Sequence, residues 1–184
     1  MRIPVSLTGE LRRFVLSRVM TRKPDFVIGK PGDDYLRRWF VIPRNVIFNI
    51  YAHQFIRSDD DRALHDHPWW NASILLDGEY VEHTIPAGGV NQRKLYKAGD
   101  VKLRSARYAH RVELVSGPCI SLFITGPRLR EWGFHCPAGW KHWKEFTAAH
   151  NSGEIGPGCD DGPVIATRPP DALRSPETNP AVPK

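Results

Sequence analysis

A series of short runs rich in β-branched and aromatic residues fills the middle of the chain, and turn-forming residues separate them. The runs lie at 37–42, 45–56, 71–78, 79–85, 93–103, 109–115 and 119–126. Short strands at such even spacing are typical of an antiparallel β-sandwich or β-barrel. The chain has 184 residues, which is enough for one domain to bury a core without metals or disulfides. The sequence therefore predicts an all-β fold.

The two ends of the chain differ from this β-rich middle. Between residues 7 and 23 apolar side chains recur at helical spacing, with Thr8 as a plausible N-cap and Glu10 in the first turn. This pattern predicts an amphipathic helix with an arginine-rich outer face. Its apolar positions are Leu7, Leu11, Phe14, Val15 and Val19. Residues 151–184 contain seven prolines and four glycines, which indicates a disordered tail.

Three segments follow from these patterns. We expect an N-terminal helix and lead-in strand at 1–44, a barrel with a flap at 45–150, and a disordered tail at 151–184. The net charge of +6 lies wholly in the first segment, which carries ten Lys or Arg against four Asp or Glu. A solvated helix face explains these cations. Nucleic acid is an unlikely partner because the rest of the chain is neutral overall.

We expect a reduced, cytoplasmic protein, because the sequence shows no recognisable targeting signal and its cysteines are widely spaced. No apolar run has the length of a membrane span, and the N-terminus lacks the apolar core of a signal peptide, so we expect no membrane partner. Cys119, Cys136 and Cys159 are odd in number and widely spaced, which favours reduced thiols over disulfides or a zinc–thiolate site. Exposed barrel edges make a homodimer a reasonable expectation.

The segment RALHDHPWWN contains two histidines one residue apart. In an extended strand His65, His67 and Trp69 project to one side. Asn71 follows on the same side, whereas Asp66 points to the other and is excluded as a ligand. Two imidazoles about 7 Å apart along the backbone can meet one metal ion. The alternative is a chance pair on a solvated strand.

A second segment, KAGDVKLRSARYAHRVEL, contains Gly99 and, further on, His110. Together with the His-x-His segment it resembles the two sequence motifs of the cupin family. The first motif runs Gly, five residues, His-x-His, three or four residues, Glu, six residues, Gly. The second runs Gly, five residues, Pro-x-Gly, two residues, His, three residues, Asn. The matching positions are His65, His67, Gly78, Gly99 and His110.

Several positions depart from these motifs. Asp59 stands at the leading Gly, and Asn71 replaces the metal-binding Glu. Ser105, Arg107 and Leu114 stand where the second motif has Pro, Gly and Asn. The usual fourth ligand of the family, a carboxylate, is therefore replaced by an amide, and Asn71 either coordinates weakly through its amide oxygen or positions a water molecule.

The resemblance covers roughly residues 48–125 and implies a cupin-like barrel of the double-stranded β-helix or jelly-roll type. His65, His67 and His110 then hold a divalent metal, with His110 and Asn71 as catalytic candidates. Three neutral imidazoles leave open positions and an uncompensated 2+ charge, which suit an anionic chelating substrate and O2 at Fe(II). Nickel, zinc or manganese fit the same nitrogens.

Four further residues are candidates for contact with the substrate. Trp69 is in line with the histidines, and Tyr108 lies near His110 in sequence. Arg128 and Arg130 follow the last strand and suit bidentate pairing with a carboxylate or phosphate. They open a segment, 126–146, in which aromatic and basic residues alternate. We interpret it as a C-terminal aromatic flap over the barrel mouth, with a base-stacking platform as the alternative.

The run at 45–56 separates by parity into two faces. Ile50 and Ala52 belong to a mostly apolar face that we expect to contact a core. Tyr51 and His53 belong to the other face, from which they can reach the metal. General burial tendencies favour a surface or core role for His53 instead.

The favoured function is that of a metal-dependent enzyme, most plausibly a mononuclear-iron dioxygenase acting on a small anionic molecule. The first alternative is a metal-free sugar or nucleotide isomerase-like protein, with His110 as a base, or a ligand-binding module. A nucleic-acid-binding protein ranks third, and its affinity would fall steeply with salt.

Overall fold

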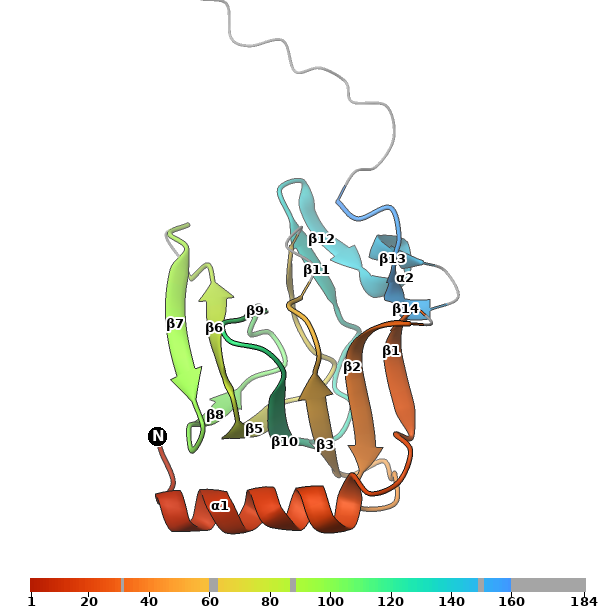
Figure 1. The fold of residues 1–184 in the computed structure, drawn as a ribbon. Helices are drawn as coiled ribbons and strands as arrows, with labels where there is room; N and C mark the ends of the chain where they lie inside the picture. Colours follow the sequence, from red (N-terminus) through yellow and green to blue (C-terminus); the bar gives the residue numbers. More distant parts are fainter. Residues whose placement is uncertain (31, 60–62, 87–88, 149–150, 160–184) are drawn as a thin grey trace, which may run out of the picture.

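The computed structural model describes residues 1–30, 32–59, 63–86, 89–148 and 151–159, with backbone alone at 30 and 151–155 (Figure 1). Its helical elements are α1 (Val5–Phe14), the π-helical turn η1 (Val15–Val19) and α2 (Trp143–Phe146). Its strands are β1 (Phe26–Lys30), β2 (Asp33–Phe40), β3 (Asn49–Phe55), β4 (Leu64–His65), β5 (Asn71–Asp77), β6 (Glu79–Thr84), β7 (Gln92–Lys97), β8 (Val101–Arg104), β9 (Arg111–Leu114), β10 (Cys119–Thr125), β11 (Gly133–Cys136), β12 (Gly139–His142), β13 (Thr147–Ala148) and β14 (Asn151–Ile155).

The strands form two facing layers, and every pairing is antiparallel. One layer is a six-stranded sheet in the order β1-β2-β3-β10-β5-β8, and β7-β6-β9 belong to the other. A bridge between His65 and His110 joins the start of β9 to β4, which pairs with the β11–β12 hairpin. Strands β3 to β10 thus divide into β3-β10-β5-β8 and β4-β9-β6-β7, which is the strand order of a jelly roll. The predicted all-β, cupin-like fold is confirmed.

Two glycines of the sequence motifs lie where the backbone needs them. Gly78 has a φ of 78° between β5 and β6, and Gly99 has a φ of 93° before β8. A Cβ on Gly78 would lie 2.7 Å from the Cys119 sulfur and 2.9 Å from the Pro118 carbonyl oxygen. Both left-handed conformation and close packing therefore require glycine at this turn.

The N-terminal helix is present but differs from the prediction in detail. It begins at Val5, and no side chain caps its N-terminus. Thr8 is buried inside the helix, and its hydroxyl donates to the Pro4 carbonyl at 3.0 Å, so the predicted N-cap is wrong. Leu7 and Phe14 are exposed. Val15 lies seven residues after Thr8 and four after Leu11, so regular helical spacing places it, rather than Phe14, against the sheet.

One apolar core lies between this helix and the outer face of the six-stranded sheet. In Figure 1 helix α1 runs along one end of the strands. The buried members of this core are Val15, Val19, Trp39, Ala52, Leu76, Ile120 and Leu122. Ile50 packs against them, and Ala52 is fully buried. The predicted apolar face of the 45–56 run is thus the face that the helix covers.

A second, smaller core lies inside the barrel. Leu75, Tyr80, Val112 and Cys119 form it. They come from β5, β6, β9 and β10, so residues of both layers meet there. Much of the remaining interior is polar, and this polar part holds the candidate site described below.

A disulfide joins Cys136 of β11 to Cys159, so the predicted reduced state of these two thiols is wrong. Their spacing in sequence follows no recognisable pattern, and only the fold brings their Cα atoms to 5.4 Å. Cys119 is a free, buried thiol. Strand β14 lies in the segment expected to be a tail, and residues 160–184 of that segment lie outside the described residues. Within the described part of the chain, no helix is long and apolar enough to cross a bilayer.

Candidate metal centre

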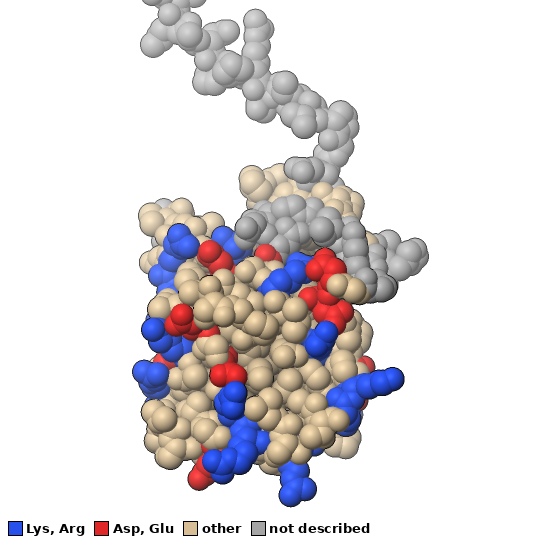
Figure 2. Space-filling model, in the orientation of Figure 1, with Lys and Arg blue, Asp and Glu red and all other residues tan. Residues whose placement is uncertain are grey.

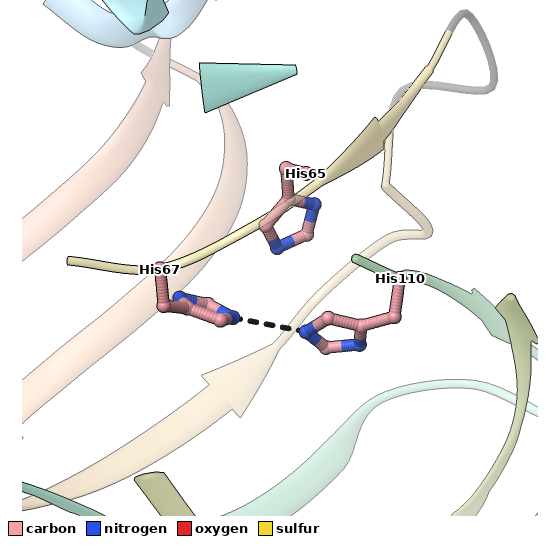
Figure 3. A group of neighbouring side chains, drawn as sticks. All are labelled: His65, His67 and His110. Carbon is pink, nitrogen blue, oxygen red and sulfur yellow. Dashed lines mark hydrogen bonds between the residues drawn. The ribbon is translucent and has the colours of Figure 1, made fainter. Parts of the chain in front are cut away.

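Three histidines from two neighbouring segments meet inside the barrel. His65 ends β4, His67 lies two residues further on, and His110 directly precedes β9. Two backbone hydrogen bonds of 2.9 Å, exchanged between His65 and His110, hold the segments together. One ring nitrogen from each histidine lies within 4.8 Å of the others. Figure 3 shows the three rings turned toward a common point, so the sequence prediction of a joint cluster is confirmed.

The spacing of these nitrogens fits one shared ion. His67 Nε2 and His110 Nε2 are 2.9 Å apart (Figure 3). Two imidazole nitrogens that bind one divalent ion at about 2.1 Å and at right angles to each other lie about 3 Å apart. Right angles belong to octahedral sites, in which three ligands on one side leave other positions open.

Burial keeps all three imidazoles in the neutral form that can bind a metal. It lowers the pKa of His65, and it places the pKa values of His67 and His110 well below their usual range. The positive charge of Arg104 acts in the same direction on each of the three. A neutral imidazole has a free lone pair, so protons compete weakly with a metal ion at neutral pH.

A buried carboxylate stands behind His110. Glu82 is 2% exposed, and its Oε1 lies 2.9 Å from His110 Nδ1. The N–H direction does not meet hydrogen-bond geometry, so we treat this as an electrostatic contact that favours a proton on Nδ1. Glu82 also pairs with buried Arg104 and lies 3.9 Å from the Lys102 ammonium. A carboxylate in this position leaves Nε2 unprotonated and free to bind a metal.

A second carboxylate stands behind His65. Asp59 Oδ2 lies 3.7 Å from His65 Nδ1. Asp59 itself accepts a hydrogen bond from the Val112 backbone N–H at 2.6 Å and another from the Tyr35 hydroxyl. This residue occupies the position at which the first motif usually has glycine, and sequence reasoning assigned it no role. Only the fold shows that it faces a candidate ligand.

Asn71 begins β5 and is completely buried. Neither its amide oxygen nor its amide nitrogen has a hydrogen-bond partner among the described residues. A buried polar group without a partner carries a free-energy cost. Such a group fits a site that a metal-bound water or substrate completes, and its predicted catalytic role stays a prediction.

Asp66 points away from the cluster, as strand parity predicted. It is 1% exposed and accepts hydrogen bonds from the Gly133 backbone at 2.9 Å and from Trp140 Nε1 at 3.0 Å. Arg130 Nη1 lies 2.7 Å and His135 Nε2 3.1 Å from its Oδ2. The carboxylate between the two histidines of the motif therefore ties β11 and β12 to the barrel.

A cavity of about 720 Å³ opens beside the histidines, and all three line it. Its walls are largely aromatic. Phe26, Phe40 and Tyr51 come from β1 to β3, Phe123 from β10, and Trp132 and Phe134 from the flap. Aromatic residues of the predicted flap thus form part of the cavity wall.

The predicted substrate-contact residues separate into two groups. Trp69 lines the cavity. Tyr108, Arg128 and Arg130 are not among its lining residues. Arg128 pairs with Glu131 at the surface, and Arg130 is held by Asp66.

Sequence reasoning missed Arg38 and underrated His53. Both line the cavity, and Arg38 Nε donates to His53 Nε2 at 2.8 Å. The parity of the 45–56 run placed His53 on the same face as Tyr51. The neighbouring strand β2, in which Arg38 faces His53 across the register, gave no comparable signal.

Comparison with known proteins finds only weak similarity in sequence and structure. No protein-family model and no curated protein matches the chain. Among solved structures, oxalate decarboxylase from Bacillus subtilis, described with Mn(II) centres, aligns with a TM-score of 0.46 and 18% identity. The alignment covers 64% of this chain and 31% of that one, so this chain spans about a third of that protein.

Two further solved structures align over roughly half of this chain. An uncharacterised Klebsiella pneumoniae protein with a double-stranded β-helix domain has a TM-score of 0.44 and 16% identity, covering 58% of this chain and 90% of that one. A DMSP lyase from Ruegeria pomeroyi has a TM-score of 0.42 and 16% identity, covering 53% and 49%. The strand order of this chain is that of a jelly roll, and its three clustered histidines are the set that the two sequence motifs imply.

Proposed function

We propose that the protein is a metal-dependent enzyme in which His65, His67 and His110 hold one divalent ion, with Fe(II) as the favoured metal and oxygenation of a small anionic molecule as the favoured reaction. The observation that carries this proposal is the convergence of three neutral imidazoles on one point of the cavity wall. A bound ion would supply a Lewis acid with open positions for substrate and O2.

The residues around the cluster support this role. Glu82 and Asp59 place negative charge beside the Nδ1 atoms of His110 and His65, and carboxylates behind metal-binding histidines raise metal affinity. The aromatic walls reduce the access of water, which strengthens electrostatic interactions at the site. Three imidazoles add no negative charge, so an anionic substrate would offset the charge of the ion.

Elemental mass spectrometry on protein purified without a histidine tag tests the proposal. We expect near-stoichiometric metal in the wild type and in His142→Ala, because His142 lies outside the cluster and contacts Glu131. We expect no metal in the variant in which His65, His67 and His110 are all alanine. A wild type without metal, even after anaerobic reconstitution with Fe(II), would contradict the metal site. Bound zinc or nickel without oxygen consumption would contradict the iron oxygenase alone.

A metal-free ligand-binding or isomerase-like protein is the second candidate. The observation that favours it is the polar pair Arg38–His53 on the cavity wall, which could hold a ligand without any ion. This candidate predicts turnover or ligand binding that survives complete removal of metal by a chelator.

The third candidate, nucleic-acid binding, has less support. Several cations of residues 1–44 form ion pairs: Arg12 with Asp77, Arg22 with Asp25, and Arg37 with Asp34. On the face shown in Figure 2, basic residues lie in separate groups with acidic and uncharged residues between them. A continuous basic stripe would track a phosphate backbone better.

A further inference from the structure

The cavity wall carries more positive than negative charge. Its lining includes Arg38, Arg44 and Arg57, and Asp59 is the only carboxylate among the lining residues that the structure describes. Asp59 already accepts hydrogen bonds from Val112 and Tyr35. Arg57 is compensated, because its Nε lies 3.3 Å from Asp33 Oδ1. The excess positive charge therefore belongs to Arg38 and Arg44.

Arg38 is held in a fixed position without a counterion. Its Nε donates to His53, and its guanidinium carbon lies 4.9 Å from the centre of the Tyr51 ring and 6.0 Å from that of Phe26. No carboxylate pairs with it among the residues that the structure describes. Burial lowers the pKa of Arg38 to about 10, so the guanidinium stays charged at neutral pH despite the cost of desolvation.

His53 fixes how this guanidinium is presented. Its ring is 3% exposed and stacks on Phe123 at 4.9 Å and on Tyr51 at 5.9 Å. Because the Nε of Arg38 is used by His53, the two terminal nitrogens remain for a ligand. A planar edge with two donors matches the two oxygens of a carboxylate.

Arg44 adds a second positive charge nearby. Its guanidinium lies 5.6 Å from the centre of the Phe40 ring, and Phe40 contacts Tyr51 at 5.6 Å. Arg44 is exposed, whereas Arg38 lies deeper in the wall. Like charges in one cavity repel each other unless an anion lies between them.

We infer that Arg38, positioned by His53, is the binding group for the carboxylate of an apolar or aromatic organic acid, whose other end faces the histidine cluster. This inference rests on the proposed function for the role of the cluster. Phe123 lies between the two places, since its ring is 4.9 Å from that of His53 and 5.9 Å from that of His67. The aromatic walls then contact the apolar part of the substrate.

This assignment replaces Arg128 and Arg130 as carboxylate-binding residues. Both follow the last barrel strand in sequence, but Glu131 and Asp66 neutralise them. A phosphate monoester carries about two negative charges at neutral pH, whereas a carboxylate carries one, which the single charge of the Arg38 guanidinium balances. A carboxylate is therefore the better match.

Binding of phenylacetate, 3-phenylpropanoate and 4-phenylbutanoate, measured by calorimetry, tests the inference. Each acid is compared with its matching alcohol, and 2-phenylethyl phosphate represents the phosphate esters. All measurements are made on the protein as purified and again after treatment with a chelator. We expect at least one acid to bind more tightly than its alcohol in both samples, because the binding group belongs to the protein and not to the metal.

Variants of β2 provide the decisive comparison. In Arg38→Met we expect the affinity for the acid to fall about tenfold to hundredfold, as for other hydrogen bonds to charged groups, while the affinity for the alcohol stays unchanged. Arg37→Met is the matched control, because Arg37 is the adjacent residue and pairs with Asp34; its affinities should equal those of the wild type. Arg38→Lys keeps the charge without the planar edge, should give an intermediate loss, and serves if the methionine variant fails to fold.

Three results would overturn the inference: an acid that binds no better than its alcohol, an Arg38→Met variant that binds like the wild type, or no binding of any acid. Tighter binding of the phosphate ester than of every acid would overturn the choice of a carboxylate. Metal content measured on the same samples separates the two proposals. If acid binding depends on Arg38 in a protein that takes up no metal, the proposed metal-dependent enzyme is contradicted and the role inferred for Arg38 stands.

Discussion

The two faces of the six-stranded sheet are built from alternate residues of the same strands, yet they serve different purposes. On β3, Ala52 faces the apolar core under the helix, whereas Tyr51 and His53 line the cavity. On β2, Trp39 faces that core and Arg38 faces the cavity. The outer face contributes stability through apolar burial. The inner face contains buried charges and an open cavity, which oppose stability and are typical of a functional site.

The largest effect is expected from a change on the inner side of the barrel. Glu82→Gln removes the negative charge that faces Arg104, Lys102 and His110. Because buried cations then lack a partner, we expect the free energy of unfolding to fall by about 3–5 kcal/mol. Metal affinity should fall about tenfold to hundredfold, since the ring of His110 loses its partner. Urea unfolding and metal titration measure the two effects.

A double variant separates these two roles of Glu82. Adding Arg104→Gln to Glu82→Gln restores the balance of charge, so part of the lost stability should return. The metal affinity should stay low, because neither change gives His110 a carboxylate. Full recovery of metal affinity in the double variant would show that Glu82 acts only as a counterion.

A change on the outer face should affect stability alone. Leu76 is 1% exposed and belongs to the core under the helix. Leu76→Ala should lower the free energy of unfolding by about 2–5 kcal/mol through lost burial and a cavity. Metal stoichiometry should be unchanged. Leu103→Ala is the control, because Leu103 is 74% exposed and its removal should change stability by less than about 0.5 kcal/mol. Loss of metal in Leu76→Ala would break the contrast between the faces.

The smallest effect concerns pH and again involves the inner face. Burial lowers the pKa values of His53, His65, His67 and His110 below 6.5. The unfolded chain therefore binds protons near pH 6.5 that the folded chain does not. The stability of the metal-free protein should be complete above this pH and should decrease as the pH falls from there toward the lowered folded-state values.

Thermal unfolding of metal-free protein between about pH 8 and about pH 5 checks this pH dependence. Leu76→Ala should show the same slope as the wild type, because its site lies on the outer face. The triple alanine variant of His65, His67 and His110 should show a weaker slope. An equal slope in the triple variant would show that these histidines are accessible to protons in the folded state.

Part of the histidine cluster was predictable because it depends on local spacing. Alternation along an extended strand places His65 and His67 on one side and Asp66 on the other, and the glycines at 78 and 99 mark turns that only glycine adopts readily. The resemblance to the second cupin motif, rather than local spacing, adds His110 to this pair. Each of the local signals is readable within a few residues, and the structure confirms them together.

Other features had no local signal. Arg38 and Arg37 are adjacent basic residues on β2, and only the pairing of β2 with β3 shows that one faces His53 while the other pairs with Asp34. Two other contacts likewise join residues far apart in sequence. They are the disulfide between Cys136 and Cys159 and the hydrogen bond that Trp140 donates to Asp66. The N-terminal boundary of the helix was missed because the helix begins at Val5 without a side-chain cap, so the hydroxyl of Thr8 was a misleading signal.

The sequence by itself determined the β-rich class, the alternating faces of the strands and the shared side of His65 and His67, because these follow from backbone periodicity and turn stereochemistry. His110 joined them through the resemblance to the cupin motifs. Only the tertiary structure decided which cations face the cavity and which carboxylates stand behind His65 and His110. The physical reason is that a charged side chain is compensated by partners that strand pairing brings close to it. Whether such a side chain has a partner can therefore be read only from the folded structure.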